Sequence, residues 1–419
     1  MTDRAASIRI TDLAAPVLDE AQQAAIRWAD HQGFDFSVEA VTAAAVARTG
    51  LDDFGAGDFR ERLAVWLEAV EGDEGLNGLG RMLVHGHVVR VLANRLRLED
   101  LSRRRPEILA EEVRAPIIVA GLPRSGTTHL LNLMSADERL RSLPYWESME
   151  PIPAPGEGPG RDGRDPRYLR CLASYEAQIE QMPLLRAMHD MPPEHIHEEI
   201  ELLEMDFATY NVEWLARVPR WRDHYLSLDM AVHFEYLRKA LQALQWLRGP
   251  RRWVLKCPQH LEWLPQLHAA FPDATIAVTH RDPVAVIQSA ITMLAYGDRT
   301  RRHRVDLDEL AGYWIDRVER LLRACVRDRD AIPAGQSVDV LFHEFMADDL
   351  GMVARIYEKA ALPFDDEARA RLQGHMDRHP RGRFGRVVYD LAADFGLDPA
   401  DVRKRFDFYF ERFGVRVEV

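Results

Sequence analysis

The stretch from Ala115 to Thr128, APIIVAGLPRSGTT, decides how this 419-residue chain is expected to fold. Its first part, Ala115 to Ala120, is a continuous apolar run, which is typical of a strand buried in a parallel sheet. The glycine-containing segment GLPRSGTT follows, and HLLNLMSADERL after it has the apolar spacing of a helix. Strand, glycine loop and helix in direct succession are the arrangement that a phosphate-binding loop requires.

The alternation of strands and helices resumes further along the chain. Strands are expected at residues 252–256, 274–279 and 337–342, and helices at residues 261–270, 283–294 and 350–361. Such alternation predicts a parallel sheet that helices cover on both faces. We therefore expect an α/β fold of the P-loop type, with three layers (αβα) and a central parallel sheet. Ligands of such sheets bind beyond the carboxyl ends of the strands.

Two further regions are expected to be helical. Residues 1–112 contain apolar residues at helical spacing but no recognisable chemistry, so we expect a helical N-terminal extension or an oligomer contact. Residues 113–419 then form the P-loop domain. Within it, a proline- and glycine-rich loop at residues 151–166 leads into a helical insert at about 155–250.

The composition excludes several classes of protein. The formal net charge of −13 argues against a general nucleic-acid binder, although a local cleft can still bind an anion. The three cysteines lie far apart, which fits a reducing compartment. The N-terminus lacks the apolar core of a signal peptide, and no run approaches the ~20 apolar residues that span a bilayer. We expect a cytoplasmic protein without stable membrane insertion.

The loop itself has the groups that bind a phosphate. Gly121 and Gly126 are separated by four residues, as in a nucleotide-binding P-loop. Glycines allow backbone N–H groups to point at an anion, and the following helix N-terminus adds partial positive charge. Thr127 and Thr128 place hydroxyl groups within reach of phosphate oxygens.

The loop departs from the Walker A pattern of ATPases and kinases. Thr127 stands where a Walker lysine would be, and the basic residue is Arg124, inside the loop. The strand that ends in His280-Arg281-Asp282 is not an obvious Walker B partner. The usual magnesium–ATP apparatus therefore looks absent, which argues against a kinase or ATPase.

A second basic site follows a later strand. Arg281 ends that strand, Pro283 suits the first turn of a helix, and Ser289 lies eight residues after Arg281. An arginine fork and a serine hydroxyl at this spacing can converge on one phosphate. The alternative is a salt bridge at the strand end and an ordinary helix serine.

The segment PRSGTT resembles the 5′-phosphosulfate loop of sulfotransferases, in the arginine form found in tyrosylprotein sulfotransferases and many bacterial sulfotransferases. The Arg281/Ser289 pair resembles their 3′-phosphate site. The resemblance implies 3′-phosphoadenosine 5′-phosphosulfate (PAPS) as the donor, 3′,5′-adenosine bisphosphate as the product, and no required metal. The cofactor contacts that it implies are Pro123, Arg124, Ser125, Gly126, Thr127, Thr128, His129, Arg281, Ser289, Arg381 and Arg383.

Some of these contacts have an equal alternative. His129 is either an adenine contact or part of the first turn of a helix, because cytosolic sulfotransferases often have a tryptophan there. Arg381 and Arg383 lie in HPRGRFGR, which resembles a late basic loop over the 3′-phosphate but is also a plausible solvated turn.

Sulfuryl transfer needs charge stabilisation and a base for the acceptor proton. Arg124 is expected to stabilise the sulfuryl group, and Lys256, at the end of a strand, to neutralise the leaving nucleotide. Two residues compete as the base. Glu147 in LPYWES resembles the glutamate of tyrosylprotein sulfotransferases. His260 follows Lys256 at two residues more than the spacing in cytosolic sulfotransferases. The arginine loop favours Glu147.

The helical insert is expected to build the acceptor pocket. His189, His195 and His197 lie near several glutamates, including Glu198, but no HExxH pattern is present, so a metal site is not favoured. The side chains expected to line an apolar pocket, or else to form helix core, are Met188, Met191, Phe207, Tyr210, Trp214 and Trp221. A pocket of this kind predicts an apolar alcohol, phenol or lipid as the acceptor.

Three functions therefore remain open on the sequence. The first is a sulfotransferase that acts on a hydroxyl group. The second is a P-loop kinase or NTPase, and the third is a catalytically silent nucleotide-binding protein.

Overall fold

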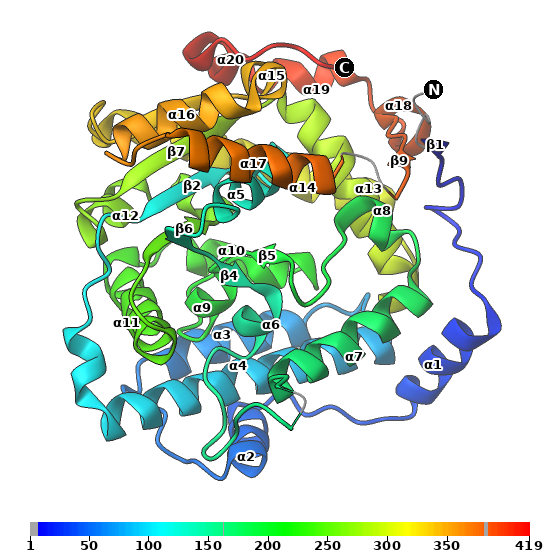
Figure 1. Cartoon of the computed structure of the whole chain (residues 1–419). Coiled ribbons are helices and arrows are strands. Elements are labelled where there is room, and N and C mark those ends of the chain that lie inside the picture. Colours follow the sequence, from blue (N-terminus) through cyan, green and yellow to red (C-terminus); the bar gives the residue numbers. More distant parts are fainter. Residues whose placement is uncertain (1–6, 162, 381–383) are drawn as a thin grey trace.

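A computed structural model describes residues 7–161, 163–380 and 384–419 (Figure 1). Across these residues, five strands form one parallel sheet in the order β3–β6–β2–β7–β8. They are β2 (Ile117–Gly121), β3 (Leu140–Arg141), β6 (Arg252–Lys256), β7 (Thr275–His280) and β8 (Ser337–Leu341). The predicted α/β fold with a central parallel sheet is confirmed. The edge strand β3 was not predicted, because a two-residue strand has no periodicity to detect.

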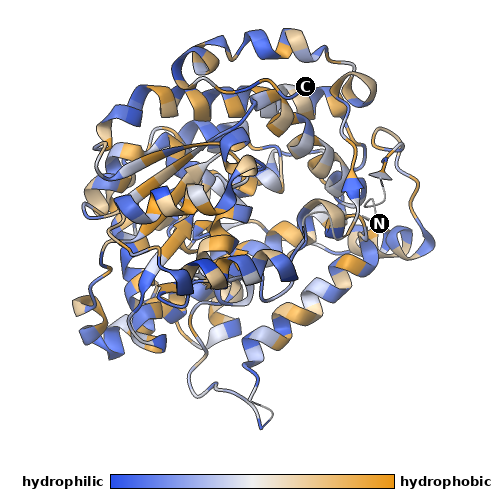
Figure 2. Cartoon of the chain, turned by 45° about the horizontal axis from the view of Figure 1, so that its top comes forward, coloured by the Kyte–Doolittle hydropathy of each residue, from blue (hydrophilic) through white to orange (hydrophobic). Residues whose placement is uncertain are grey.

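Helices cover both faces of the sheet, since alternate side chains of each strand point to opposite faces. Ile117 and Val119 of β2 join a core with α5 (Thr127–Ser135), α16 (Asp349–Lys359) and α17 (Asp366–Arg378). Ile118 and Ala120 face a larger core, to which α11 (Met230–Arg248), α12 (Leu264–Ala270), α13 (Pro283–Arg301) and α14 (Leu307–Asp328) contribute. Figure 2 shows the strands of the sheet as predominantly hydrophobic. Burial on both faces explains why these strands are continuous apolar runs.

The N-terminal region is helical, as expected. Its helices are α1 (Glu20–Asp30), α2 (Val38–Thr49), α3 (Phe59–Glu71), α4 (Gly78–Arg104) and the 3₁₀ helix η1 (Pro106–Ala110), and the short strand β1 (Ser7–Ile8) precedes them. Its side chains belong to the same core as those of the insert and the larger face of the sheet. Arg62 and Arg95 both form ion pairs with Asp206 of the insert, at 3.0 and 2.8 Å. Because these groups are buried, the extension and the insert share one interior.

The insert contains more than helices. Besides α11, its elements are α7 (Pro166–Gln181), α8 (Leu185–His189), β5 (Ile196–His197), α9 (Ile200–Glu204), η2 (Asn211–Trp214) and α10 (Pro219–Tyr225). β5 pairs antiparallel with β4 (Leu143–Pro144), which leads into α6 (Tyr145–Met149). This short ribbon ties the insert to the segment that follows the P-loop helix. The ribbon was not predicted, because two residues per strand are too few to show a periodic pattern.

The C-terminal region contains one further strand, which belongs to a separate two-stranded sheet. After β8 and α15 (Phe342–Ala347), β9 (Arg386–Val387) pairs in parallel with β1 (Ser7–Ile8) near the N-terminus. The final segment forms α18 (Leu391–Phe395), α19 (Pro399–Lys404) and α20 (Asp407–Phe413). None of the described helices has both the length and the hydrophobicity to cross a membrane.

Candidate active site

The site lies where three strands of the sheet end, and it includes the P-loop. Gly121, Lys256 and His280 are the last residues of β2, β6 and β7 and therefore lie at the same edge of the sheet. A Cβ atom on Gly121 would lie 1.8 Å from Thr279 Oγ1, so only glycine allows β2 and β7 to pack this closely at their ends. This edge is where parallel sheets bind ligands.

The P-loop adopts the conformation that an anion cradle needs. Arg124 has a φ of 68° and Gly126 a φ of 89°, so both lie in the left-handed region. A non-glycine residue rarely adopts such a φ, and residues that do so cluster at functional sites. The first N–H groups of α5 have no partner within their own helix. In the described chain, the hydroxyls of Thr127 and Thr128 donate no hydrogen bond, which leaves them available for an anion.

Ser125 has a different role from its neighbours. Its hydroxyl lies 2.6 Å from the Leu122 carbonyl oxygen, to which it donates, and 2.7 Å from Thr279 Oγ1. The side chain is 1% exposed. Ser125 therefore fixes the loop to β7 through its side chain, and the side chain does not face the opening of the site.

Arg124 connects the loop to the second basic site. Its Nε donates to Ser289 Oγ at 3.0 Å on α13, and its Nη1 donates to the Met188 carbonyl at 2.7 Å on α8. Arg281 donates from Nη1 to the Arg124 carbonyl at 2.6 Å. The structure thus brings together Arg124, Arg281 and Ser289, which lie up to 165 residues apart in sequence.

The family follows from a comparison of this chain with known proteins. A family model described as the sulfotransferase family matches residues 116–366, a span that includes the P-loop, Lys256, Arg281 and Ser289. The chain belongs to the sulfotransferase family. It is accordingly a transferase, and the predicted family is confirmed.

Two solved sulfotransferases show the similarity over nearly the whole chain. Sulfotransferase STF1 from Mycobacterium tuberculosis H37Rv is 30% identical, with a TM-score of 0.77, and the match covers 88% of this chain and 98% of that one. Sulfotransferase STF9 from Mycobacterium avium is 27% identical, with a TM-score of 0.80, and the match covers 92% and 100%. No curated protein sequence matches the chain significantly.

Lys256 of this sulfotransferase lies beside a carboxylate that the sequence did not single out as a base. Its ammonium group forms an ion pair with Glu198, which follows β5. Burial raises the pKa of Glu198, and the opposing charge of Lys256 lowers it only in part. Lys256 is 3% exposed and Glu198 15% exposed at the side chain. A partly accessible carboxylate with a raised pKa next to a lysine has the properties of a general base.

Three histidines surround this pair. The ring centroids of His189 and His195 are 5.5 Å apart, and those of His195 and His197 are 5.9 Å apart. Burial, together with the charge of nearby Lys256, lowers the pKa of His195 to about 3. The pKa values of His189 and His197 also lie well below the ordinary value, for the same primary reason. These imidazoles are therefore neutral at physiological pH.

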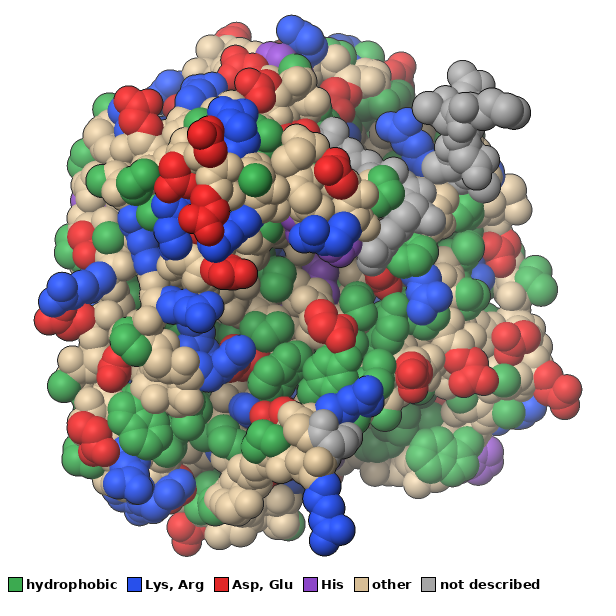
Figure 3. All heavy atoms as spheres, viewed as in Figure 1, with side chains coloured by type: hydrophobic (Ala, Val, Ile, Leu, Met, Phe, Trp, Pro, Cys, Tyr) green, Lys and Arg blue, Asp and Glu red, His purple; other side chains and the backbone are tan. Residues whose placement is uncertain are grey.

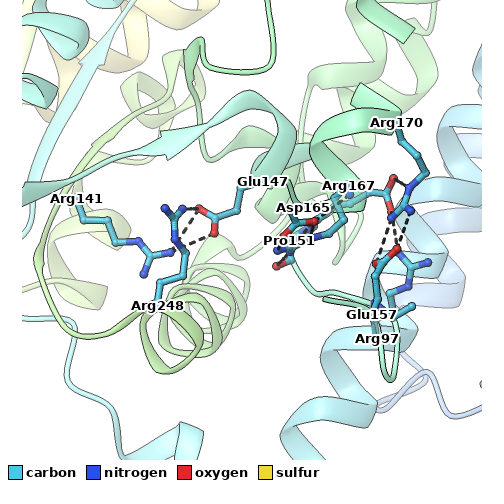
Figure 4. A network of polar contacts seen from close by, with 11 residues as sticks. Arg97, Arg141, Glu147, Pro151, Glu157, Asp165, Arg167, Arg170 and Arg248 are labelled. Carbon is cyan, nitrogen blue, oxygen red and sulfur yellow. Dashed lines mark hydrogen bonds and ion pairs between the residues drawn. The ribbon is translucent and has the colours of Figure 1, made fainter. Parts of the chain in front are cut away.

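Glu147, the base that the sequence favoured, lies elsewhere. Its carboxylate forms ion pairs with Arg248 at 2.9 Å and Arg141 at 3.4 Å (Figure 4). Arg141 pairs in register with Trp253, near the start of β6, whereas Lys256 is at the opposite end of that strand. The Glu147 side chain is 1% exposed. The structure does not bring Glu147 together with the P-loop, and its location argues against the role of base.

His260, the other candidate base, lies inside the core. Its side chain is fully buried, and Nε2 contacts Glu199 Oε1 at 2.6 Å. Its ring packs near Phe234, with the ring centroids 5.6 Å apart. A side chain without accessible surface cannot take a proton directly from an acceptor.

Several aromatic residues of the insert form core and not pocket. Phe207, Tyr210 and Trp221 are each at most 1% exposed, and Trp221 Nε1 donates to the Thr209 carbonyl at 2.9 Å. Trp214 packs against Trp314, with the ring centroids 4.2 Å apart. Of the two interpretations that the sequence left open, the structure favours helix core for these residues. Met188 is also buried but borders the site, because its carbonyl binds Arg124.

The face that carries the P-loop is hollowed near its centre. Figure 3 shows hydrophobic side chains gathered in this hollow below α17, next to histidine. Two other surface cavities, of about 600 and 620 Å³, share no residue with the site.

His129 contacts α16. Its Nε2 lies 2.8 Å from Asp349 Oδ1, and its ring packs on Phe345 with a centroid distance of 5.2 Å. These contacts leave the predicted adenine contact without support from the structure. Arg381 and Arg383, the residues of the predicted late basic loop, lie outside the described residues.

His87, Glu201 and Glu204 form a cluster. One atom of each residue that could bind a metal ion lies within 4.8 Å of the corresponding atoms of the other two. Arg90 Nη2 lies 3.0 Å from His87 Nδ1 and 2.8 Å from Glu201 Oε2. Because arginine only donates, Nδ1 of His87 is the acceptor, and its Nε2 carries the proton that faces Glu204. A protonated nitrogen does not bind a metal. The ion pair of Arg90 with Glu201 and the contact of His87 Nε2 with Glu204 Oε1, at 2.8 Å, therefore account for this cluster without an ion.

Proposed function

We propose that this sulfotransferase moves a sulfuryl group from PAPS to a hydroxyl group of an apolar small molecule or lipid. The observation that carries the proposal is the connection of Arg124, in a left-handed anion loop, with both Ser289 and Arg281. A nucleotide with phosphates at the 5′ and 3′ positions needs two anion sites joined in this way. A kinase loop would instead pair its anion site with magnesium ligands.

The residues present fit this donor. The loop from Pro123 to Thr128 has backbone N–H groups and free hydroxyls for the 5′-phosphosulfate. Arg281 offers a planar fork for the 3′-phosphate, and its guanidinium carbon lies 3.9 Å from the centre of the Phe342 ring. Ser289 adds a hydroxyl. We retain Arg381 and Arg383 as proposed 3′-phosphate contacts.

The transfer assigns one role to each charged group. Glu198 accepts the proton of the acceptor hydroxyl, whose oxygen forms the new bond to sulfur. The bond between sulfur and the bridging phosphate oxygen breaks, and the electron pair remains on that oxygen. Lys256 neutralises the charge that develops there, and Arg124 stabilises the sulfuryl oxygens. Side-chain cations do this without a metal. Glu198 replaces Glu147 and His260 in the role of base.

The remaining predictions concern the surroundings of the site. We propose that the insert at about 155–250 supplies the acceptor side of the P-loop domain, residues 113–419. The apolar hollow and the neutral histidines suit an acceptor with an apolar body and one hydroxyl. We retain a cytoplasmic location and a homo-oligomer as predictions.

A thermal-shift comparison tests the donor. We expect 3′,5′-adenosine bisphosphate to stabilise the protein, with or without EDTA, more than ADP with magnesium does. Arg281→Ala should remove most of this preference, because ADP lacks the 3′-phosphate. Equal shifts for the two nucleotides would sink the donor assignment, and a shift only with magnesium and ADP would favour a kinase. Transfer of ³⁵S from labelled PAPS to a panel of phenols, sterols and long-chain alcohols tests the acceptor class.

A further inference from the structure

Glu198 and Glu199 hold the end of β6 from two sides. Glu198 forms the ion pair with the Lys256 ammonium group, and Glu199 Oε2 accepts the Lys256 backbone N–H at 2.7 Å. The side chain of Glu198 is 15% exposed, whereas that of Glu199 is 1% exposed. Two successive residues thus bind the same lysine, one at the site and one in the core.

Glu199 is itself held by His260. Its other oxygen, Oε1, lies 2.6 Å from His260 Nε2, and His260 belongs to η3 (Pro258–Glu262), which directly follows β6 and Cys257. Among the described residues, His260 Nδ1 has no hydrogen-bond partner. The neutral tautomer that fits is therefore the one with the proton on Nε2, which donates to Glu199.

A buried carboxylate with two donors is fixed in position, since rotation would leave both a buried N–H and its own charge without a partner. Glu199 is peptide-bonded to Glu198, so a fixed Glu199 limits where the Glu198 carboxylate can lie. The hydrogen bond from the Lys256 backbone N–H to Glu199 fixes the lysine backbone against the same carboxylate. The orientation of base and lysine is thereby determined from inside the core.

We infer that Glu199 and His260 are a positioning pair, which aligns the Glu198 carboxylate with the Lys256 ammonium group for sulfuryl transfer. This inference rests on the proposed function. It gives His260 a role in turnover without contact with the substrate, and it assigns Glu199 a role that the sequence did not indicate. Binding of the nucleotide involves the P-loop, Arg281 and the charge of Lys256, all of which variants of the pair retain.

A conservative substitution separates positioning from catalysis. A glutamine side chain can place an amide N–H close to the position of His260 Nε2, but it cannot act as a base. We expect His260→Gln to retain most of the wild-type kcat and His260→Ala to lower kcat about 10- to 100-fold, as misplacement of a catalytic group does. Both variants should bind 3′,5′-adenosine bisphosphate with the wild-type Kd.

The readout is the formation of 3′,5′-adenosine bisphosphate from PAPS. With water as the acceptor the other product is inorganic sulfate, and with 2-naphthol, used where that reaction is faster, it is the naphthyl sulfate ester. Calorimetry supplies the Kd of 3′,5′-adenosine bisphosphate for each variant. Gln259→Ala is the matched control. Gln259 is fully buried in the same 3₁₀ helix, but its hydrogen bonds go to the Thr209 hydroxyl and the Ala208 carbonyl. The Gln259→Ala protein should therefore lose stability with little loss of kcat per folded molecule.

Wild-type kcat in His260→Ala would overturn the inference, as would an equal loss of kcat in Gln259→Ala. Loss of kcat in His260→Gln to the level of His260→Ala would also overturn it and favour a direct catalytic histidine. If His260→Ala does not fold, Glu199→Gln carries the test, because the two donors reach different oxygens of Glu199 and an amide has only one oxygen. It should lower kcat at unchanged Kd, and wild-type kcat there would overturn the inference. A wild-type protein that neither binds the bisphosphate nor releases sulfate would instead sink the proposed function.

Discussion

Glu418 binds Arg281 through two parallel contacts. Arg281 Nε lies 2.9 Å from Glu418 Oε1, and Arg281 Nη2 lies 2.8 Å from Glu418 Oε2. The backbone N–H of Glu418 donates to Asp282 Oδ2 at 2.9 Å, so the C-terminal segment is attached next to the strand end that carries Arg281. A carboxylate therefore holds the guanidinium fork that we assign to the 3′-phosphate of the nucleotide.

The nucleotide is expected to displace Glu418 from Arg281. Glu418→Gln should then tighten the binding of 3′,5′-adenosine bisphosphate by about tenfold, since a charge-assisted bidentate contact no longer competes. Calorimetry with the bisphosphate and with 5′-AMP measures the effect. 5′-AMP, which lacks the 3′-phosphate, should bind both proteins alike, and Glu411→Gln, at an exposed site on α20, is the control. Weaker binding of the bisphosphate in Glu418→Gln would mean that Glu418 orients Arg281 for the phosphate.

Arg124 is expected to matter for turnover more than for nucleotide binding. Arg124→Ala removes the stabilising charge on the sulfuryl group, so kcat should fall about 10²- to 10³-fold, as for the loss of one such donor elsewhere. Single-turnover release of sulfate from PAPS measures this. Ser289→Ala removes the partner of Arg124 Nε and one hydroxyl of the proposed 3′-phosphate site but keeps the arginine charge, so it should lower kcat less. A wild-type rate in Arg124→Ala would contradict the assigned role.

The pH profile of kcat should have an acid limb, in which kcat falls at low pH because Glu198 becomes protonated. Burial raises the pKa of this carboxyl, Glu199 and Glu201 raise it further, and Lys256 opposes them. A base must be deprotonated, so kcat should rise with pH through a value above the ordinary glutamate pKa. Glu198→Gln should lower kcat about 10²- to 10⁴-fold and abolish the limb. A limb that persists in this variant would place the base elsewhere.

Glu147 is expected to stabilise the fold. Removal of its carboxylate leaves the buried Arg141 guanidinium, whose pKa burial already lowers to about 10, without its nearest counter-charge. Glu147→Ala should therefore lower the free energy of unfolding by about 3 kcal/mol, as measured by urea denaturation. The kcat per folded molecule should not change. A folded Glu147→Ala protein without turnover would return the role of base to Glu147.

Asp339 should contribute to stability in a pH-dependent way. Burial raises the pKa of its carboxyl, but hydrogen bonds from His280 and Arg329 outweigh this effect and lower the pKa to about 2. The group is more acidic in the folded chain than in the unfolded chain. Its contribution is therefore present above about pH 4 and is lost as the pH falls toward 2. The Tm of the wild type should fall more steeply over this range than that of Asp339→Asn, and parallel Tm curves would contradict the assignment.

Two short elements of the fold could not be predicted from the sequence. β3 and the β4–β5 ribbon have two residues per strand, which is too short for any periodicity, yet β5 directly precedes Glu198. Local resemblance favoured Glu147 as the base. It could not show that Arg141 and Arg248 surround this residue, since Arg248 is 101 residues away along the chain.

The sequence by itself determined the loop and its neighbours. Strand, glycine spacing, Arg124 and helix lie within fourteen contiguous residues, 115–128, and backbone preferences over such a distance are local. Tertiary structure alone decided which carboxylates meet which cations. Glu198 meets Lys256 across 58 residues, and Glu418 meets Arg281 across 137. The cause of these contacts is the packing of the insert and the C-terminal segment on the strand ends, to which no local pattern corresponds.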